Sequence, residues 1–453
     1  MGLHIIILAA GQGKRMHSEL PKVLHHVAGK PMLAHVIECA KSLSPQNIHV
    51  VIGHGSQQVK MAIADDSIHW CVQSEQLGTG HAVQQAVPEL QDDHNVLVLY
   101  GDVPLLIPET LRQLLEKLSK YDLVLLSASL LDPTGYGRIV RDSENKVQRI
   151  VEQKDADSRT ISICEINTGI LATKTKLLKN WLSNIDNKNV QKEFYLTDCI
   201  ELAVKNQCNV EAVVCDNNNE ILGINNKSQL AHAERIYQRR IAEKLMLAGT
   251  TLMDPNRLDV RGELVTGKNV EIDVNSVFVG TNTLNDNVKI GANTIIINSS
   301  IQSGTCIHPN CHIENAVIGN DCDIGPFARI RPDAVLSKNV KVGNFVEIKK
   351  SNINDGSKVN HLSYIGDSDL GKNVNIGAGT ISCNYDGANK HRTIIGDNVF
   401  VGSDTQFVAP VTIGDGSTIG AGSTITKDTP KEKLTISRSK QVTIDNWQRP
   451  NKK

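Results

Sequence analysis

A repeat with a period of six residues runs through the C-terminal half of the chain, from about residue 272 to residue 428. Aliphatic side chains recur at every sixth position, and a glycine often follows them. This period predicts a parallel β-helix, in which three hexads make one coil. One hexad buries almost nothing, so the array is stable only when its coils stack. A clear run of the step is Ile318, Ile324, Ile330, Leu336, Val342 and Ile348.

The register of the repeat is interrupted in a way that predicts a loop. It slips by one residue at three places, after Ile313, Ile348 and Ile365. A longer interruption lies before Ile395, where the polar segment 382–390 fits no hexad. We expect this segment to project from the β-helix, because projecting loops on repeat scaffolds usually carry the binding surface.

The register also predicts which side chains meet on neighbouring coils, which lie ~4.8 Å apart. Arg331 and Lys349 both follow a repeat aliphatic residue by one place and should stack. Two like charges this close call for an anion, so we expect a phosphate or carboxylate ligand there. His361 and Ala378 both stand two places after a repeat aliphatic residue. His361 is therefore a candidate general base beside the projecting loop, the alternative being a solvated surface histidine.

The N-terminal part of the chain alternates strand and helix patterns. Strands are predicted at 4–10, 48–52, 70–72 and 95–100, and helices include 31–41 and 80–87. This order predicts a parallel sheet wrapped by helices, with ligands bound beyond the carboxyl ends of the strands. Residues 123–225 show a mixed pattern.

The loop after the first strand, residues 11–15, resembles a dinucleotide fingerprint but lacks its third glycine, because Met16 stands there. It also lacks the Walker pattern. What remains is a flexible loop whose backbone N–H groups can approach phosphates, together with the cations Arg15 and Lys22. The alternative is a tight turn with solvated basic residues.

Two further segments carry polar groups at predicted strand ends. Asp102 follows an apolar strand, and one carboxylate at such a place suits Mg²⁺, which fills its shell with phosphates and water. The alternative is a turn or helix N-cap residue. Residues 73–80 form a glycine-containing loop of amides and hydroxyls that suits a base edge, the alternative being an ordinary loop.

Length and composition set the limits of the interpretation. A chain of 453 residues predicts two or three domains, and its net charge of -1 argues against nucleic-acid or membrane partners. No apolar run approaches ~18 residues, and the start lacks the features of a signal peptide. The ten cysteines show no CxxC pair, which favours buried thiols in a reducing cytoplasm.

A helix predicted at 228–248, capped by Ser228 and ended by Gly249, divides the chain. We interpret it as a connector, although it also fits a terminal helix of the first domain. The predicted boundaries are a nucleotide-binding domain at 1–227, a linker helix at 228–249, and a β-helix domain with a C-terminal tail at 250–453.

Seven motifs together resemble one enzyme family, the bacterial bifunctional N-acetylglucosamine-1-phosphate uridylyltransferases / glucosamine-1-phosphate N-acetyltransferases. The resemblance covers nearly the whole chain. The motifs are Leu8-Ala-Ala-Gly11-x-Gly-x-Arg15-Met, Pro21-Lys22-Val-Leu, Gln76-Leu-Gly-Thr-Gly-His, Tyr100-Gly-Asp-Val-Pro, Glu165-Ile-Asn-Thr-Gly, Gly343-Asn-Phe-Val-Glu and Asn384-Tyr-Asp-Gly-Ala-Asn-Lys390.

The resemblance implies a Rossmann-like α/β nucleotidyltransferase domain followed by a left-handed parallel β-helix, assembled as a homotrimer in the cytoplasm. The left hand comes only from the family, since parallel crossovers are otherwise almost always right-handed. The implied reactions are acetylation of glucosamine-1-phosphate by acetyl-CoA, then transfer of UMP from UTP to N-acetylglucosamine-1-phosphate. The UDP-N-acetylglucosamine formed, with release of pyrophosphate, feeds peptidoglycan and lipopolysaccharide synthesis.

The resemblance also implies roles for residues of the uridylyl site. Arg15 neutralises the departing pyrophosphate, and Asp102 and Asn225 hold Mg²⁺. The residues implied to bind nucleotide and sugar are Leu8, Ala9, Ala10, Gly11, Lys22, Gln73, Gly78, Thr79, Tyr100, Gly101, Asp102, Gly137, Glu152, Asn167 and Asn225.

In the acetyl site, His361 matches the family's general base. The sugar phosphate is implied to contact Arg331, Lys349, Tyr364, Asn375 and Lys390. Acetyl-CoA is implied to contact Ala378, Asn384, Tyr385, Ser403, Ala421 and Arg438. We expect the substrates on the edges of the β-helix and between neighbouring subunits.

Two departures from the family pattern spare these motifs: Lys14 replaces a usual Thr or Ser, and residues 281–287 carry Asn in place of a Gly-bearing turn. Two rival functions each explain part of the sequence. Another sugar-1-phosphate nucleotidyltransferase with a purely oligomerising β-helix does not need His361 or the 383–390 loop. A non-enzymatic scaffold does not need Arg15, Lys22, Asp102 and Asn225 together.

Overall fold

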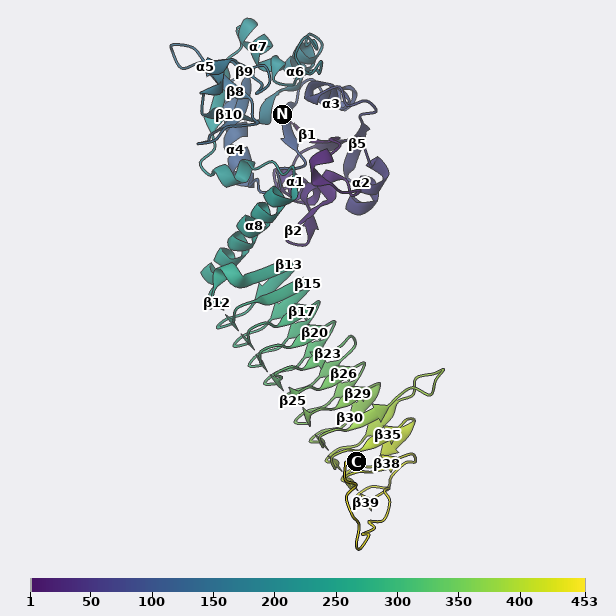
Figure 1. The fold of residues 1–453 in the computed structure, drawn as a ribbon. Helices are drawn as coiled ribbons and strands as arrows, with labels where there is room; N and C mark the ends of the chain where they lie inside the picture. The colour runs from purple at the N-terminus through teal and green to yellow at the C-terminus, as the bar shows by residue number, and fades with distance from the viewer. Residues whose placement is uncertain (1, 453) are drawn as a thin grey trace. The chain divides into compact units, whose positions relative to one another are not determined.

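The computed structural model describes residues 2–452, which divide between Tyr237 and Gln238 into two compact units (Figure 1). The division falls inside the long helix α8 (Lys227–Leu247). None of the described helices is long and apolar enough to cross a membrane.

The first unit is built on a nine-stranded sheet in the order β11-β7-β10-β6-β1-β4-β5, with β8 and β9 attached through β10. Strands β1, β4, β5 and β6 are parallel to one another, which confirms the prediction for the first hundred residues. Strand β10 is antiparallel to both of its neighbours. The strands are β1 (Leu3–Ala9), β4 (Asn47–Ile52), β5 (Ile68–Val72), β6 (Asn95–Tyr100), β7 (Leu123–Ser129), β8 (Arg138–Arg141), β9 (Val147–Val151), β10 (Glu165–Lys174) and β11 (Val210–Val214), beside the small hairpin of β2 (His26–Val27) and β3 (Lys30–Pro31).

Helices cover both faces of this sheet, which is why its central strands are continuous apolar runs. Ile5 and Ile7 pack on one face beneath α1, α2 and α4, while Ile6 and Leu8 pack on the other beneath α3, α6 and α7. The helices are α1 (Met32–Lys41), α2 (Ser56–Ile63), α3 (Thr79–Gln84), α4 (Pro108–Glu116), α5 (Ser158–Ile161), α6 (Thr175–Leu182) and α7 (Asp198–Lys205), with the 3₁₀ turns η1 (Lys14–Met16), η2 (Lys22–Leu24), η3 (Val87–Glu89), η4 (Lys117–Ser119) and η5 (Asn218–Ile221).

The register of the central strands places the predicted loops at one edge. Leu8 of β1 lies opposite Tyr100 of β6, so the loop after β1 and the segment at Gly101 and Asp102 leave the sheet side by side.

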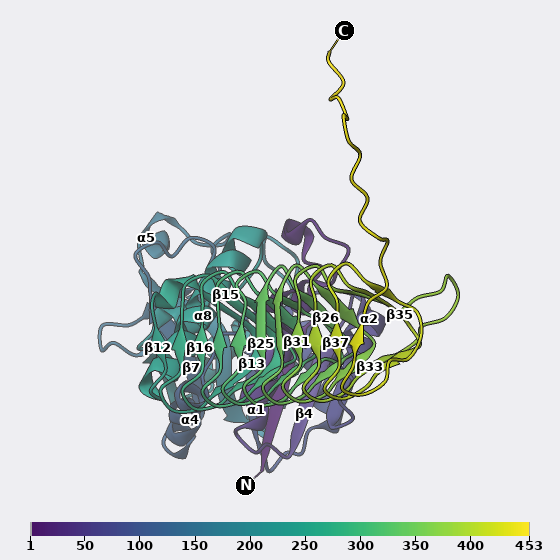
Figure 2. The same cartoon turned by 90° about the horizontal axis from the view of Figure 1, so that it is seen from below.

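The second unit is a parallel β-helix, as the hexads predict (Figure 2). One ladder of short strands comprises β12 (Thr251–Leu252), β14 (Glu271–Ile272), β16 (Lys289–Ile290), β19 (Cys306–Ile307), β22 (Asp323–Ile324), β25 (Lys341–Asn344), β28 (Lys358–His361), β31 (Asn375–Ile376), β34 (Phe400–Val401), β37 (Thr418–Ile419) and β39 (Leu434–Thr435).

A second, 17-stranded sheet makes the other two ladders, and the turn η6 (Pro255–Arg257) precedes it. Its strands are β13 (Leu258–Thr266), β15 (Ser276–Leu284), β17 (Ile295–Ile297), β18 (Ser300–Ile301), β20 (His312–Glu314), β21 (Val317–Ile318), β23 (Arg329–Ile330), β24 (Val335–Leu336), β26 (Glu347–Lys349), β27 (Asn352–Ile353), β29 (Tyr364–Gly366), β30 (Ser368–Leu370), β32 (Ile381–Cys383), β33 (Thr393–Ile395), β35 (Gln406–Val408), β36 (Val411–Ile413) and β38 (Thr424–Ile425).

The repeat aliphatic residues form the core of the β-helix. Ile330, Ile348 and Ile365 pair in consecutive coils and are all fully buried, so the one-residue slip after Ile348 is absorbed without a break in the column. Asn residues occupy many of the corners, and Asn287 has φ of 61°, a left-handed conformation that Asn tolerates. The left-handed coiling of the helix remains a prediction from the family.

Three details of the sequence interpretation can be compared with the structure. Helix α8 begins at Lys227, and Asn226 caps it by accepting from the Gln229 N–H at 2.8 Å, so the Ser228 cap was wrong. Gly249 has φ of 100° just after the helix, which confirms the predicted stop. All ten cysteines are free, and six are buried, but Cys164 is exposed.

Candidate active sites

The centre of the first site is an ammonium group held between two oxygen ligands from distant parts of the chain. Lys22 Nζ donates to the Asp102 carboxylate and, at 2.8 Å, to Asn225 Oδ1. Lys22 and Asp102 are both largely buried. The structure thus brings together three residues that the sequence analysis assigned to one site, and the two oxygens already converge on a positive charge.

Two loops frame this edge of the sheet and contact each other through Gln12 and Gln76, whose side chains are 3.3 Å apart. Gln73 is buried and donates to the Gly78 carbonyl at 3.1 Å, so its amide fixes the shape of its own loop. Thr79 Oγ1 accepts from the Leu196 N–H at 3.0 Å. These bonds tie the predicted base-reading loop to the segment before α7.

The loop after β1 is open to solvent at its glycine. Leu8, Ala9 and Ala10 are buried, whereas Gly11 is exposed, and a Cβ added there would meet nothing within 4 Å. Arg15 lies exposed on η1. A glycine that the protein's own packing does not require fits a place where a ligand approaches the backbone.

Tyr100, at the end of β6, lies directly against Gly169 of β10. A Cβ on Gly169 would come within 2.5 Å of the Tyr100 ring, and its φ of 84° is also left-handed. Burial, followed by the charges of Glu152 and Asp102, raises the pKa of Tyr100. The phenol therefore stays neutral. It lies between Asp102, predicted to bind the metal, and Glu152, predicted to bind the sugar.

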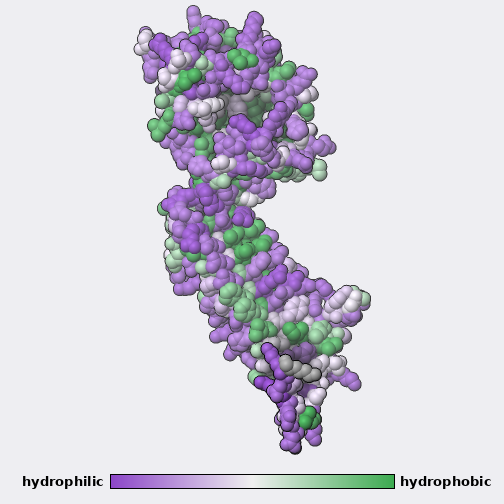
Figure 3. Space-filling view, viewed as in Figure 1, coloured by the Kyte–Doolittle hydropathy of each residue, from purple (hydrophilic) through white to green (hydrophobic). Residues whose placement is uncertain are grey.

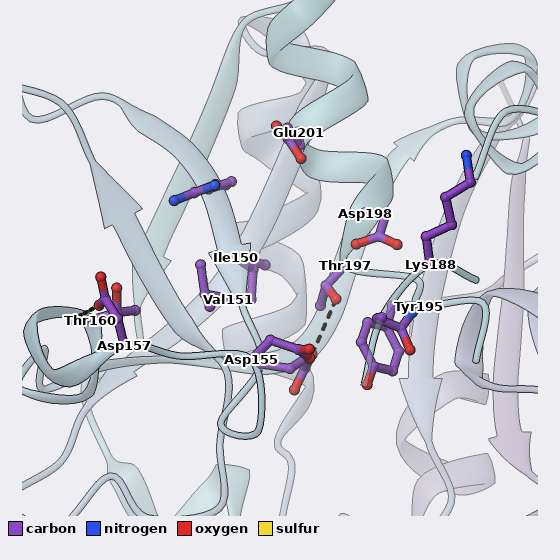
Figure 4. A pocket seen from close by; sticks show the side chains of 13 residues that line it. Ile150, Val151, Asp155, Asp157, Thr160, Lys188, Tyr195, Thr197, Asp198 and Glu201 are labelled. Carbon is purple, nitrogen blue, oxygen red and sulfur yellow. Dashed lines mark hydrogen bonds between the residues drawn. The ribbon is translucent and has the colours of Figure 1, made fainter. Parts of the chain in front are cut away.

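The predicted sugar-binding residues meet around β8 and β10. The Asn167 N–H donates to the Gly137 carbonyl at 2.8 Å, and a Cβ on Gly137 would lie 3.3 Å from both Glu152 oxygens. Thr197 donates to Glu152 at 3.1 Å, a bond drawn in Figure 4. Burial raises the pKa of Glu152, and the Thr197 hydrogen bond opposes this shift.

Glu152 also lines a pocket of about 370 Å³ beside α7 (Figure 4). Five carboxyl groups face it against two basic side chains, so the pocket suits hydroxyl and amide groups better than phosphate. Burial, followed by neighbouring carboxylates, raises the pKa of Asp198 to about 6. The acidic lining residues are Glu152, Asp155, Asp157, Asp198 and Glu201.

The β-helix stacks its predicted residues as the register requires, but Arg331 already has a partner of opposite charge. Ile330 pairs with Ile348, so Arg331 and Lys349 follow on adjacent coils. Arg331, however, forms an ion pair of 2.6 Å with Glu347, which raises the pKa of the guanidinium. A carboxylate of the chain therefore compensates Arg331, and the need for an external anion rests on the lysines.

Lys349 lies beside Lys390 of the projecting loop. This second ammonium, followed by burial, lowers the pKa of Lys349. Two neighbouring ammonium groups suit an anionic ligand such as a phosphate. Tyr364 lies one coil above Glu347 on the same ladder. Asn375 lies on the other sheet, opposite Lys358 and Phe400.

His361 stands at the end of β28, over Asn344 of the coil below. Its Nδ1 is 3.1 Å from Asn344 Oδ1, and since that oxygen only accepts, Nδ1 carries the proton. In the neutral form of this tautomer, Nε2 is the nitrogen that can accept a proton. The Gly379 N–H donates to the His361 carbonyl at 3.3 Å, which confirms that the histidine lies beside the turn at Ala378.

The segment after β32 projects from the β-helix in both views, as predicted (Figures 1 and 2). Asp386 holds its tip by accepting from the N–H groups of Ala388 and Asn389 and by pairing with His391 at 2.6 Å. At its base, Asn384 donates to the buried Asp367 at 2.5 Å.

Three of the residues predicted to contact acetyl-CoA, Ala378, Ser403 and Ala421, follow one corner of successive coils. The Asp404 N–H donates to the Ala378 carbonyl at 2.7 Å, and the Gly422 N–H donates to the Ser403 carbonyl at 2.8 Å. Arg438 reaches back to the Ala421 carbonyl at 2.6 Å. Tyr385 is 60% exposed at the base of the loop.

Comparisons with known proteins address both units. Residues 5–155 match the MobA-like NTP transferase domain, residues 260–341 the GMPPB C-terminal domain, and residues 392–427 the bacterial transferase hexapeptide (six repeats). A protein of Cupriavidus pinatubonensis called Bifunctional protein GlmU is 55% identical over 451 residues, covering 100% of this chain and 99% of the relative. A protein of the same name from Marinobacter nauticus is 54% identical over 450 residues, 99% of each chain. The chain belongs to the GlmU family. It is a bifunctional enzyme, a uridylyltransferase and an acetyltransferase.

Several partners of the predicted residues in this GlmU family member were missed by sequence reasoning. Asn344 orients His361, Glu347 neutralises Arg331, Thr197 holds Glu152 and Asp367 holds Asn384. The hexad register contained a signal for Asn344, which stands one 17-residue coil before His361. For Thr197 we find no sequence signal.

Proposed function

We propose that the chain carries out two consecutive reactions at the sites described above. Glucosamine-1-phosphate is first acetylated at the β-helix, and the N-acetylglucosamine-1-phosphate formed then receives UMP from UTP at the N-terminal sheet. The products are UDP-N-acetylglucosamine and pyrophosphate, and the activated sugar supplies peptidoglycan and lipopolysaccharide synthesis in the cytoplasm. The observation that carries the uridylyl assignment is the convergence of the Asp102 and Asn225 oxygens on Lys22.

Asp102 and Asn225 fit a magnesium ion, because both present hard oxygen atoms to a cation already. When bound, Mg²⁺ supplies positive charge to the triphosphate. The chain's own groups do the remaining work. Lys22 and Arg15 neutralise the phosphates and the leaving pyrophosphate, while Tyr100 and Glu152 position the sugar. The sugar phosphate oxygen attacks the α-phosphorus, so catalysis depends mainly on positioning two anions.

For acetyl transfer, His361 Nε2 takes a proton from the amino group of glucosamine-1-phosphate as the nitrogen attacks the thioester carbonyl. The new C–N bond forms, the C–S bond breaks, and CoA leaves as the thiol. Lys349 and Lys390 hold the sugar phosphate, with Arg331 beside them. Acetyl-CoA lies along the corner of Ala378, Ser403 and Ala421, where backbone N–H groups stabilise the oxyanion.

The oligomer proposed for this chain is a homotrimer built on the β-helix. Val317 and Val335 are register partners on neighbouring coils, yet they are 46% and 40% exposed. Phe327 and Phe345 stack at 5.4 Å and are about half exposed. Figure 3 shows hydrophobic residues gathered on the visible face of the β-helix. Exposed apolar columns of this kind favour a subunit interface.

Light scattering after gel filtration tests the trimer. The wild-type chain should elute with three times its own mass, and Val335→Glu should shift the distribution to smaller species. A monomeric wild-type protein with full acetyltransferase activity contradicts the proposal.

A pair of variants tests the assignment of the two sites. Asp102→Ala should lose formation of UDP-N-acetylglucosamine and keep CoA release from acetyl-CoA with glucosamine-1-phosphate. His361→Ala should show the reverse pattern. EDTA should stop the first activity and spare the second. If either variant loses both activities in a folded trimer, the two-site assignment is wrong, and absence of CoA release from wild type favours a nucleotidyltransferase with an oligomerising β-helix.

A further inference from the structure

Four histidines form a row across the first unit at the edge of the sheet opposite the uridylyl site. His4, His49 and His69 stand near the amino ends of β1, β4 and β5, and His94 immediately precedes β6. The ring centroids are 5.0 Å apart for His94 and His4, 5.5 Å for His4 and His49, and 5.1 Å for His49 and His69. The reactions proposed above use none of these side chains.

One end of this row gathers three ligand atoms of the kind that transition metals prefer. Glu89, on the short turn η3, places Oε2 at 3.2 Å from His69 Nδ1 and at 3.7 Å from His49 Nδ1. All three atoms lie within 4.8 Å of one another. Ligands of a tetrahedral Zn²⁺ with bonds of about 2.0–2.2 Å stand roughly 3.3–3.6 Å apart. The distances of 3.2 Å and 3.7 Å from Glu89 Oε2 to the two histidine nitrogens are close to this separation.

The buried member of the group has its ring nitrogens unsatisfied. His49 is 0% exposed, and neither of its ring nitrogens has a hydrogen-bond partner among residues 2–452. A buried imidazole without partners is unfavourable, and a metal bond at Nδ1 would satisfy one of the two nitrogens.

We propose that His49, His69 and Glu89 bind a divalent transition-metal ion of the Zn²⁺ class. Two imidazole nitrogens and one carboxylate leave a fourth position for water, and this ligand set favours Zn²⁺ over Mg²⁺, which prefers oxygen. The side chains of His69 and Glu89 are about half exposed, which gives the ion a path from solvent. The bound ion links β4 and β5 to η3 and stabilises the first unit through ligand linkage.

The other charged and titratable groups around this row already have partners. Lys179 of α6 pairs with Asp92 at 2.6 Å, and Asp93 pairs with His94 at 2.7 Å. The Gln91 N–H donates to His4 Nε2 at 3.2 Å. These partners occupy His94 and one side of His4, so the described contacts leave His49, His69 and Glu89 as the three-ligand set.

Zinc titration of the full-length protein tests the site. Calorimetry in saturating Mg²⁺, which fills the oxygen site at Asp102 and Asn225, should show Zn²⁺ binding to wild type. His69→Gln and Glu89→Gln should each remove one ion per chain or weaken its binding at least tenfold. Both changes are at half-exposed side chains, so melting temperatures without metal should match wild type. The exposed His26 supplies the matched control, and His26→Gln should bind Zn²⁺ like wild type.

Two readouts separate this site from other causes. Uridylyl transfer should be unchanged in His69→Gln without zinc, because the row lies at the opposite edge of the sheet. A second group of potential ligands, Cys306, His308 and Asp323, lies in the β-helix. Zn²⁺ binding that is equal in wild type and His69→Gln, or that is lost only in Cys306→Ser, overturns the proposal, as does a wild-type protein that binds no Zn²⁺.

Discussion

The hydrogen bond between Asn344 and His361 gives a prediction that separates orientation of the base from its chemistry. Asn344→Ala removes the acceptor that holds the proton on His361 Nδ1, 3.1 Å away. The imidazole is then free to place its proton on Nε2, the atom that must accept from the substrate amine. Acetyl transfer should slow, whereas uridylyl transfer in the other unit should stay at the wild-type rate.

The size of the effect follows from the kind of bond that is lost. A hydrogen bond between neutral groups contributes about 0.5–1.5 kcal/mol, which corresponds to a rate lower by about 2- to 12-fold. Removing the base itself, in His361→Ala, should cost about 10²- to 10⁴-fold. Asn344→Asp keeps an acceptor oxygen and should recover most of the rate.

The assay is CoA release at saturating acetyl-CoA and glucosamine-1-phosphate, followed by thiol detection. Asn354→Ala changes an exposed Asn elsewhere on the β-helix and serves as the control. In the His361→Ala background, Asn344→Ala should have no further effect, because the two residues act as one unit. A fully active Asn344→Ala, or one that is additive with His361→Ala, refutes the orienting role.

Three other predictions follow from packing and charge. Gly169→Ala forces a left-handed φ on alanine, which costs about 1–2 kcal/mol, and its new methyl group collides with the Tyr100 ring. Uridylyl transfer should therefore fall while CoA release continues. An equal loss of both activities would point to misfolding. Ile348→Ala leaves a cavity at a fully buried core position. It should lower the unfolding free energy of the β-helix by about 2–5 kcal/mol, measured by urea titration. The control Val265→Ala, at a half-exposed position, should change this free energy little. Asp198 has a folded pKa raised to about 6, so its charged form costs stability as pH rises from about 4 through 6. Asp198→Asn should therefore melt at a higher temperature than wild type at pH 8 and at the same temperature as wild type at pH 4; a gain at pH 4 alone would reverse the assigned sign.

The sequence was most informative where one residue type recurs at a fixed spacing. The hexads predicted that Arg331 stacks over Lys349 and that His361 stands beside Ala378, because a coil length fixes which residues become neighbours. The apolar run before Tyr100 likewise predicted the strand that delivers Asp102. The local pattern predicted the wrong cap for α8, because the side chain of Asn226, and not that of Ser228, accepts the N–H at the start of the helix.

Side-chain contacts between residues that are far apart in the sequence could not be predicted from local patterns. Thr197 and Glu152 are joined by the approach of α7 to β9, which no short pattern encodes. Glu347 also escaped prediction, since a diagonal contact between coils depends on the side-chain direction and not only on the register.

The sequence alone therefore determined the parallel β-helix and the parallel part of the N-terminal sheet, and it predicted the chemical groups of both candidate sites. Only the tertiary structure decided which partners these groups have. Arg331 pairs with Glu347, Lys22 donates to Asp102 and Asn225, and His361 contacts Asn344. It also brought together three histidines of β1, β4 and β5 with His94, which immediately precedes β6. The physical reason is that periodicity fixes neighbours within a repeat, whereas charge and hydrogen-bond partners depend on distances between side chains that only the folded chain sets.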